Sequence, residues 1–179
     1  MNAPVACLVP DGCTWPIVLG VDPGTHVMGY GAIVIAPDGP RLLTAGVLRA
    51  KASDAASLRI GQLGVAFEGV LTQTRPTTIA IENAFSHRNP RTAIRLGEAR
   101  GMVIAAGFRR GVPIVEISPA DAKKRITGNG RAAKEQVAAM VRRLLGLGES
   151  DGLKEDATDA LALALAYARR QELSNLLSR

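Results

Sequence analysis

Short apolar runs that end in turn signals divide the first part of the chain into strands. Residues 17–22 are rich in β-branched side chains and end at Pro-Gly, which indicates a buried strand followed by a turn. Residues 30–35 form the expected return strand, and a Pro-Asp-Gly-Pro turn leads into a third strand over residues 42–48. The pattern predicts an antiparallel three-strand meander at the start of the fold.

Helices and strands alternate after this meander. Apolar positions recur at helical spacing over residues 53–73, and Arg75-Pro76 then ends the pattern. We expect next a strand over 78–82, a helix over 89–109, a strand over 113–117 and mostly helical segments to the end. Because crossover helices must cover the strands they connect, this order predicts an α/β fold with a mixed sheet and helices on both faces.

The domain organisation predicted from composition is simple. No internal repeat, low-complexity segment or linker-like composition divides the chain. We therefore expect a flexible N-terminal extension over residues 1–16 and one domain over residues 17–175. Cys7 and Cys13 both lie in the extension and have no neighbouring His or Cys to complete a zinc site, and no apolar run is long enough to cross a bilayer. These features predict a cytoplasmic protein.

Positive charge is concentrated in one region. The chain carries 22 Lys and Arg against 16 Asp and Glu, a net charge of +6. Residues 88–143 hold thirteen of the basic and four of the acidic residues, so this stretch carries +9 and the remainder −3. Such a region favours a polyanionic partner, although a solvated surface explains charge alone equally well.

Four acidic residues occupy positions where a buried sheet would not normally accept them. Asp22 and Glu82 each end an apolar strand, and Asp156 and Asp159 share one face at the start of the apolar last helix. Each alone has an ordinary structural explanation, as a turn cap or as an acid at a helix N-terminus. If the four converge, their mutual repulsion requires a cation, and oxygen ligands select Mg²⁺ or Mn²⁺. Two such ions would support phosphodiester hydrolysis.

With these positions in view, the chain resembles the RuvC-type Holliday-junction resolvases from Leu19 to about Arg170. The resemblance rests on three segments that occur in the family's order: VLGVDPGTHVMGYGAI, IAIENAF and EDATDALALALA. It implies an RNase H-like fold, a homodimer, a branch-migration motor complex as partner, and paired, metal-dependent cutting of four-way DNA junctions. It also carries the catalytic and metal-binding roles onto Asp22, Glu82, Asp156 and Asp159, with Glu155 ranked below Asp156.

The same resemblance, together with the basic region, predicts the residues that contact DNA. Phe85 takes the place of an aromatic that stacks on a base, with core packing as the alternative for this ring. Lys123 and Lys134 match basic positions that serve junction binding or catalysis. The predicted DNA-binding set is completed by Arg88 and Arg91, which share a helix face with Arg95, and by further cations beyond the next strand: Lys124, Arg125 and Arg131.

Small residues at four-residue spacing, Gly97, Gly101 and Ala105, permit another helix to pack closely against the predicted helix over 89–109. The partner helix is either within the chain or on a second copy. His26 and His87 are assigned no catalytic role, because a surface or phosphate-contacting role explains them as well.

Three alternatives remain open at this point. The Asp-Pro-Gly-Thr segment that begins at Asp22 also resembles the phosphate loop of actin-like and sugar-kinase ATPases, although no second glycine-rich loop follows. A non-catalytic DNA-binding protein would show the same basic region. Another RNase H-like nuclease with a different nucleic-acid substrate would carry the same acids.

Overall fold

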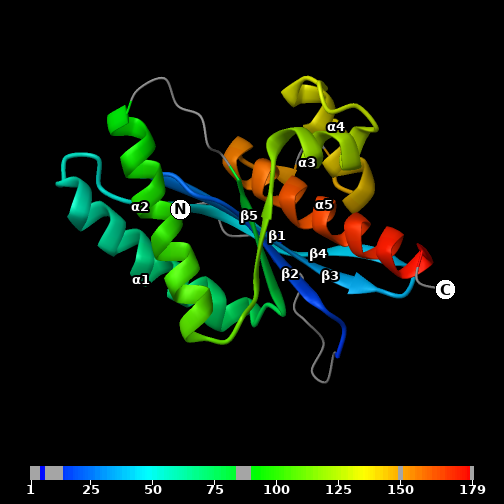
Figure 1. Ribbon diagram of the computed structural model, residues 1–179, viewed down its shortest axis with the longest axis horizontal. Coiled ribbons are helices and arrows are strands. Elements are labelled where there is room, and N and C mark those ends of the chain that lie inside the picture. The colour runs from blue at the N-terminus through cyan, green and yellow to red at the C-terminus, as the bar shows by residue number, and fades with distance from the viewer. Residues whose placement is uncertain (1–4, 7–13, 84–89, 149–150, 178–179) are drawn as a thin grey trace.

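The computed structural model describes residues 5–6, 14–83, 90–148 and 151–177, and its centre is a six-stranded mixed sheet (Figure 1). The strand order is β1-β4-β3-β2-β5-β6. Neighbours from β1 to β2 pair antiparallel, whereas β5 is parallel to both β2 and β6. The strands are β1 (Val5–Ala6), β2 (Ile17–Asp22), β3 (Val27–Ala36), β4 (Gly39–Arg49), β5 (Thr78–Glu82) and β6 (Ile114–Ile117). The predicted meander and mixed sheet are confirmed.

Two differences from the expected strands have a common cause. β3 and β4 extend beyond the predicted 30–35 and 42–48, because their pairing continues from Val27 opposite Arg49 to the turn at Gly39. In addition, Val5 and Ala6 pair with Ala45 and Thr44 at the edge of the sheet. Residues 5 and 6 of the expected N-terminal extension therefore form a short edge strand, β1. Backbone pairing at an open edge requires no side-chain periodicity, so such short additions leave no pattern in the sequence.

In the part of the chain that the structure describes, five helices cover the sheet, two on one face and three on the other (Figure 1). They are α1 (Ala56–Thr74), α2 (Pro90–Arg109), α3 (Pro119–Thr127), α4 (Lys134–Leu145) and α5 (Glu155–Leu177). α3 begins at an N-cap, Ser118, whose hydroxyl accepts a hydrogen bond from the Asp121 backbone N–H, and ends at Gly128 in the left-handed conformation. The predicted helices on both faces are confirmed. Within the described ranges, none of these helices has the length and hydropathy that a bilayer-spanning segment requires.

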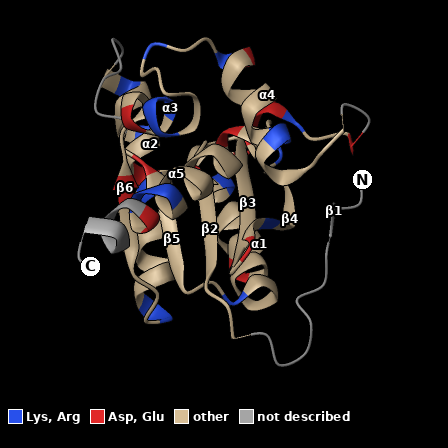
Figure 2. Ribbon diagram, turned by 90° about the vertical axis from the view of Figure 1, so that its right-hand side faces the viewer, with Lys and Arg blue, Asp and Glu red and all other residues tan. Residues whose placement is uncertain are grey.

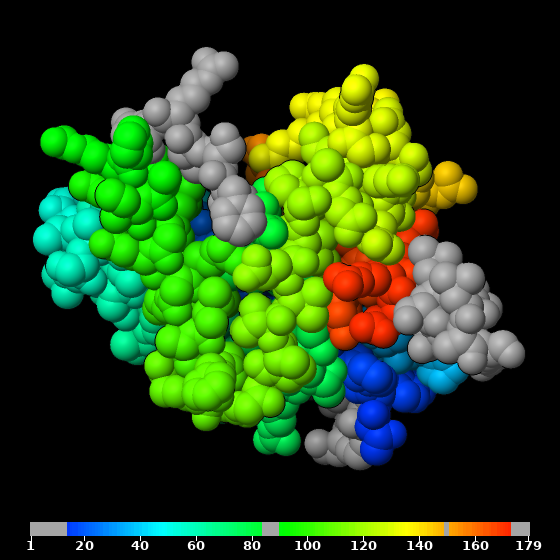
Figure 3. Space-filling model, viewed as in Figure 1, coloured from blue at the N-terminus to red at the C-terminus, as the bar shows by residue number. Residues whose placement is uncertain are grey.

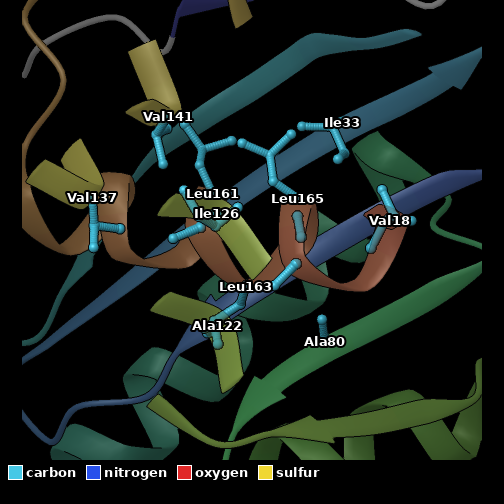
Figure 4. Close-up of a cluster of buried hydrophobic side chains, with 14 of the residues drawn as sticks. Val18, Ile33, Ala80, Ala122, Ile126, Val137, Val141, Leu161, Leu163 and Leu165 are labelled. Atoms are coloured by element: carbon cyan, nitrogen blue, oxygen red, sulfur yellow. The ribbon is translucent and has the colours of Figure 1, made fainter. Parts of the chain in front are cut away.

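The sheet separates two apolar clusters because neighbouring residues of each strand face opposite sides. Val18, Ile33 and Ala80 pack under α3, α4 and α5, and Figure 4 shows them with Leu161 and Leu165 of α5. The residues on either side of them in β2 and β5, Leu19, Ile79 and Ile81 among them, pack under α1 and α2 with Phe67. Burial on both faces explains why these strands are almost continuously apolar.

Candidate active site

Two acidic residues lie side by side where the central strands end. β2 and β5 are parallel neighbours, and their last paired residues are Val21 and Ile81. Asp22 and Glu82 directly follow these residues, so both emerge at the same edge of the sheet. Each is partly exposed, whereas the preceding residues of both strands are buried. Because each of these apolar strands ends in an acidic residue, the two carboxylates lie together, as the sequence predicts.

Glycines in the sheet bring the acids of α5 to this edge. A Cβ atom at Gly29 would lie 2.0 Å from the Asp156 carbonyl oxygen, and one at Gly20 would lie 1.8 Å from the Ala160 carbonyl oxygen. Only glycine permits so close an approach between the strands and the first turns of α5. Because Gly29 is the strand partner of Asp22, the beginning of α5 is seated next to the Asp22 strand end. This role of Gly20 and Gly29 was not predicted from the sequence, although both stand inside the motif that carries the resemblance.

The carboxylates and two lysines line one hollow, which we call the acidic cleft. It has a volume of about 180 Å³ and contains Asp22, Glu82 and Asp159 together with Lys123 and Lys134. Its remaining walls are mostly apolar and come from α3, α4 and α5: Pro119, Ala122, Val137, Ala162 and Leu163. In the space-filling view, the surfaces of α2 and of α3 and α4 stand apart, and atoms from the beginning of α5 are visible between them (Figure 3).

The acids of this region share one electrostatic field. Burial, followed by the charges of Glu82, Asp159 and Asp156, raises the pKa of the Asp22 carboxyl to about 7, and the Lys134 charge opposes this rise. Asp156 therefore acts on Asp22 although its side chain does not line the cleft. Glu155 is not among these charges, which favours Asp156 over Glu155 as the fourth member of the set. The four predicted acids are brought together.

Lys134 pairs directly with acids at the beginning of α5. Its ammonium group lies 2.8 Å from an Asp159 carboxylate oxygen and also pairs with Glu155. Burial opposes the charge, but the hydrogen bonds to Asp159 and Glu155 outweigh it and raise the pKa of Lys134. The same ammonium group lowers the pKa of Glu155. Lys134 thus stays protonated at neutral pH and neutralises part of the acid set.

The residues fit divalent cations by their chemistry. Within the described ranges, no three His, Cys, Asp or Glu side chains stand in an arrangement that would already hold an ion. Yet the Asp22 carboxyl is partly buried beside other carboxylates whose charges raise its pKa, so a divalent cation would relieve this repulsion. Oxygen-only donors at such a place match Mg²⁺ or Mn²⁺. Asp22, Glu82, Asp156 and Asp159 are the residues that could hold them.

The other predicted DNA contacts are distributed over different surfaces. Lys123 faces the acidic cleft, whereas Arg125 lies on the other side of α3, 2.8 Å from Asp121 in a salt bridge. Lys124 and Arg131 are exposed near α3, and Arg91 is exposed in the first turn of α2. Figure 2 shows basic residues next to acidic ones around α3 and α4. Phe85, Arg88 and His87 lie outside the described residues.

A mixed sheet that begins as an antiparallel meander, with acids from two strand ends and one helix in a shared cleft, defines an RNase H-like, metal-dependent nuclease. Comparison with known proteins narrows the class. The family model described as "Crossover junction endodeoxyribonuclease RuvC" matches residues 18–167. The chain belongs to the RuvC family, and it is an endonuclease that resolves Holliday junctions in DNA recombination and repair.

Individual relatives are similar in sequence to this chain over most of their length. A crossover junction endodeoxyribonuclease RuvC of Chlorobaculum parvum is 45% identical over 83% of this chain and 79% of its own length. The Halorhodospira halophila protein of the same name is 43% identical over 86% of this chain and 90% of its own. Among solved structures, T. thermophilus RuvC in complex with Holliday junction substrate has a TM-score of 0.82 at 36% identity, covering 89% of this chain and 96% of that one. The RNase H-like fold is confirmed. These similarities argue against the two alternatives of an ATPase and a non-catalytic DNA-binding protein.

Proposed function

We propose that Asp22, Glu82, Asp156 and Asp159 are the catalytic acids, and that together they bind two divalent ions for hydrolysis of phosphodiester bonds in four-way DNA junctions. The observation that carries this proposal is the acidic cleft, which holds Asp22, Glu82 and Asp159 together. Burial and the charges of Glu82, Asp159 and nearby Asp156 raise the pKa of Asp22 to about 7. Such a site gains most from a divalent cation. Mg²⁺ is the proposed physiological ion, and Mn²⁺ is an adequate substitute for the same oxygen ligands.

Bound ions supply Lewis-acid activation of water and of the phosphate group. The chain's own residues provide the rest of the site. Lys123 and Lys134 lie at the cleft beside the acids, where ammonium groups attract and orient a phosphodiester. Val137, Ala162 and Leu163 form an apolar wall that limits water and strengthens these charge interactions. We assign Lys123 and Lys134 to phosphate contact and the carboxylates to ion binding.

We further propose that a homodimer makes two symmetric cuts. α2 presents an exposed face with two large apolar side chains, Ile94 at 64% and Phe108 at 82% exposure. Between them lie Gly97, Gly101 and Ala105, and a Cβ atom at either glycine would meet no atom within 4 Å. The small-residue line thus has no helix against it within the described chain. A second α2 helix fits this face, and a two-fold dimer matches the two-fold symmetry of a four-way junction.

The remaining assignments rest on the family resemblance and on charge. We propose that Phe85 stacks on a base at the branch point and that Arg88, Arg91, Lys124, Arg125 and Arg131 contact the DNA backbone. Arg125 is the weakest of these because its guanidinium is already bound to Asp121. A branch-migration motor complex as partner and a cytoplasmic location belong to the same proposal, since both follow from the substrate and from the sequence features above.

The decisive experiment compares Asp22→Asn with Asp38→Asn, a matched change at an exposed acid in the β3–β4 turn. Each variant is incubated with a synthetic four-way junction, a linear duplex and an RNA–DNA hybrid, with Mg²⁺, Mn²⁺ or chelator. We expect Asp22→Asn to lose cleavage but keep junction binding, and Asp38→Asn to match the wild type. Full activity of Asp22→Asn would contradict the proposed metal site. Preferential cleavage of the hybrid would mean that an RNA–DNA hybrid, and not a four-way junction, is the substrate.

A further inference from the structure

α1 contains a buried arginine that the proposed catalytic centre does not use. Arg59 is only 5% exposed and lies in the first turn of α1, beside the loop that follows Asp22. None of the salt bridges formed by the described residues includes it. A buried cation without an acidic partner is costly, and an apolar side chain of similar size would occupy this position at lower cost. The N–H groups of Arg59 must therefore find acceptors other than a carboxylate.

Those N–H groups bind backbone carbonyls of two different loops. The Arg59 Nε–H donates to the Thr25 carbonyl oxygen over 3.1 Å, and Nη1 donates to the Asp54 carbonyl oxygen. The Nη2 group is buried and has no hydrogen-bond partner. Nε and Nη2 form one edge of the planar guanidinium, so the unpartnered group lies on the edge that faces the Thr25 loop. Arg59 thus connects the loop after β2 to the loop before α1.

The loop after β2 directly follows Asp22, the last residue of that strand. Its turn is tight, since a Cβ atom at Gly24 would lie 2.0 Å from the Val27 carbonyl oxygen. Beyond Arg59, it is held by the Ala50 backbone N–H, which donates to the His26 carbonyl oxygen over 3.0 Å. The Asp54 loop is in turn tied to α1, because the Gln62 amide donates to the Asp54 carboxylate over 2.8 Å. A rigid helix therefore fixes the backbone that carries Asp22 into the acidic cleft.

We propose that Arg59 is a positioning residue for the catalytic centre: its guanidinium holds the turn at Thr25 and thereby directs the Asp22 carboxylate toward Glu82 and Asp159. The inference rests on the proposed function of Asp22 as an ion ligand. Arg59 does not touch DNA or the reacting atoms. Its loss weakens binding of divalent ions, while the surfaces that bind the junction remain unchanged.

Arg110 offers a matched control at the opposite end of α1. It also holds α1 through several hydrogen bonds, to the carboxylate and carbonyl oxygens of Glu68 and to the Thr72 hydroxyl. These contacts lie between α1 and the end of α2, away from the acids. Arg59→Met and Arg110→Met therefore each remove an arginine that anchors α1, but only Arg59→Met releases the turn after Asp22.

The experiment measures the Mg²⁺ concentration for half-maximal junction cleavage, the junction Kd in chelator, and Tm for both variants. We expect Arg59→Met to raise the half-maximal Mg²⁺ concentration by about tenfold or more, with an unchanged Kd, and Arg110→Met to lower Tm without this shift. Arg59→Lys, which keeps the charge but not the planar fork, should show a smaller shift. Millimolar methylguanidinium should restore the Mg²⁺ dependence of Arg59→Ala.

Two results would overturn the positioning role. One is an unaltered Mg²⁺ dependence in both Arg59→Met and Arg59→Lys. The other is an equal shift in Arg110→Met, which would mean that any loosening of α1 has this effect. If Arg59→Met does not fold, Arg59→Lys and its comparison with Arg110→Met decide the question. Failure of the proposed function itself is recognised separately, because Asp22→Asn would then cleave normally.

Discussion

The two faces of the sheet are packed with different kinds of side chain. Under α1 and α2 the core is built of large residues, including Phe67, Leu63, Leu71 and Ile79, each less than 2% exposed. Under α5 the strands present Gly20, Gly29 and Gly31, and the helix itself alternates alanine with leucine. Large side chains keep a helix about 10 Å from a sheet, whereas glycine lets its backbone approach the strands. Only the closely packed face brings helix acids next to strand acids.

This difference indicates that one face of the sheet contributes more to stability and the other more to catalysis. The large-residue face buries the most apolar surface per side chain and therefore contributes most of the hydrophobic stabilisation per residue. The glycine-rich face stabilises less per residue, but it sets the separation of Asp22 from Asp156 and Asp159. Substitutions on the two faces should therefore affect stability and cleavage in different proportions.

The largest effect on stability is expected on the large-residue face. Phe67→Ala removes a fully buried ring from the packing between α1 and the sheet, and should lower the free energy of unfolding by about 3–5 kcal/mol. Cleavage per folded molecule at low temperature should stay near the wild-type rate, because the ring is remote from the acidic cleft. Urea unfolding, with a parallel assay of cleavage normalised to folded protein, measures both. A fall in cleavage beyond the loss of folded protein would break the proposed division between the faces.

Gly29→Ala should affect cleavage more than stability. Its Cβ would lie 2.0 Å from the Asp156 carbonyl oxygen, so α5 must shift away from Asp22 at a cost of about 1–3 kcal/mol. Cleavage should fall by about tenfold to a hundredfold beyond the loss of folded protein, since displaced ligands weaken ion binding.

Gly64→Ala on the opposite face is the matched control for this change. A Cβ there approaches only the side chain of Met102, at 3.3 Å, and that flexible side chain can move. Stability and cleavage should both stay close to wild type. If Gly29→Ala were as harmless as Gly64→Ala in the cleavage assay, the close approach of α5 would not be what positions the acids.

The charge set on the glycine-rich face should also give stability a distinctive pH dependence. The pKa of Asp22 rises from 3.8 to about 7 on folding, so between these values the folded chain binds a proton more tightly than the unfolded chain. In chelator, the free energy of unfolding should therefore decrease as pH rises from about 4 to about 7, by on the order of 1–3 kcal/mol. Asp22→Asn should flatten this decrease, and saturating Mg²⁺ should abolish it, because ions bind the deprotonated carboxylates. Parallel profiles of the two proteins in chelator would contradict the coupling.

Much of this arrangement could be predicted from sequence because it depends on local patterns. Apolar strands that end in Asp22 and Glu82 are visible as runs, and parallel neighbours put their ends at one edge. Convergence of Asp156 and Asp159 on that edge came from resemblance, because no local pattern encodes which strands α5 crosses. Arg59 was missed because an arginine in a helix is usually exposed. Its burial depends on Thr25 and Asp54, which lie 34 and five positions away in the chain.

The smallest expected effect tests whether DNA binding by α3 is confined to the surface that faces the acidic cleft. α3 directs Lys123 into the acidic cleft but Arg125 toward Asp121 on its other surface. Lys123→Ala should weaken junction binding at low salt and reduce the salt slope by about one unit, as expected for one lost phosphate contact. Arg125→Ala should change junction binding much less, because the Arg125 guanidinium is already held by Asp121 in a partly buried salt bridge. Binding measured over a series of salt concentrations distinguishes the two variants. Equal slopes for both would extend the DNA surface around α3, and would mean that the acidic cleft is only one part of a wider basic face.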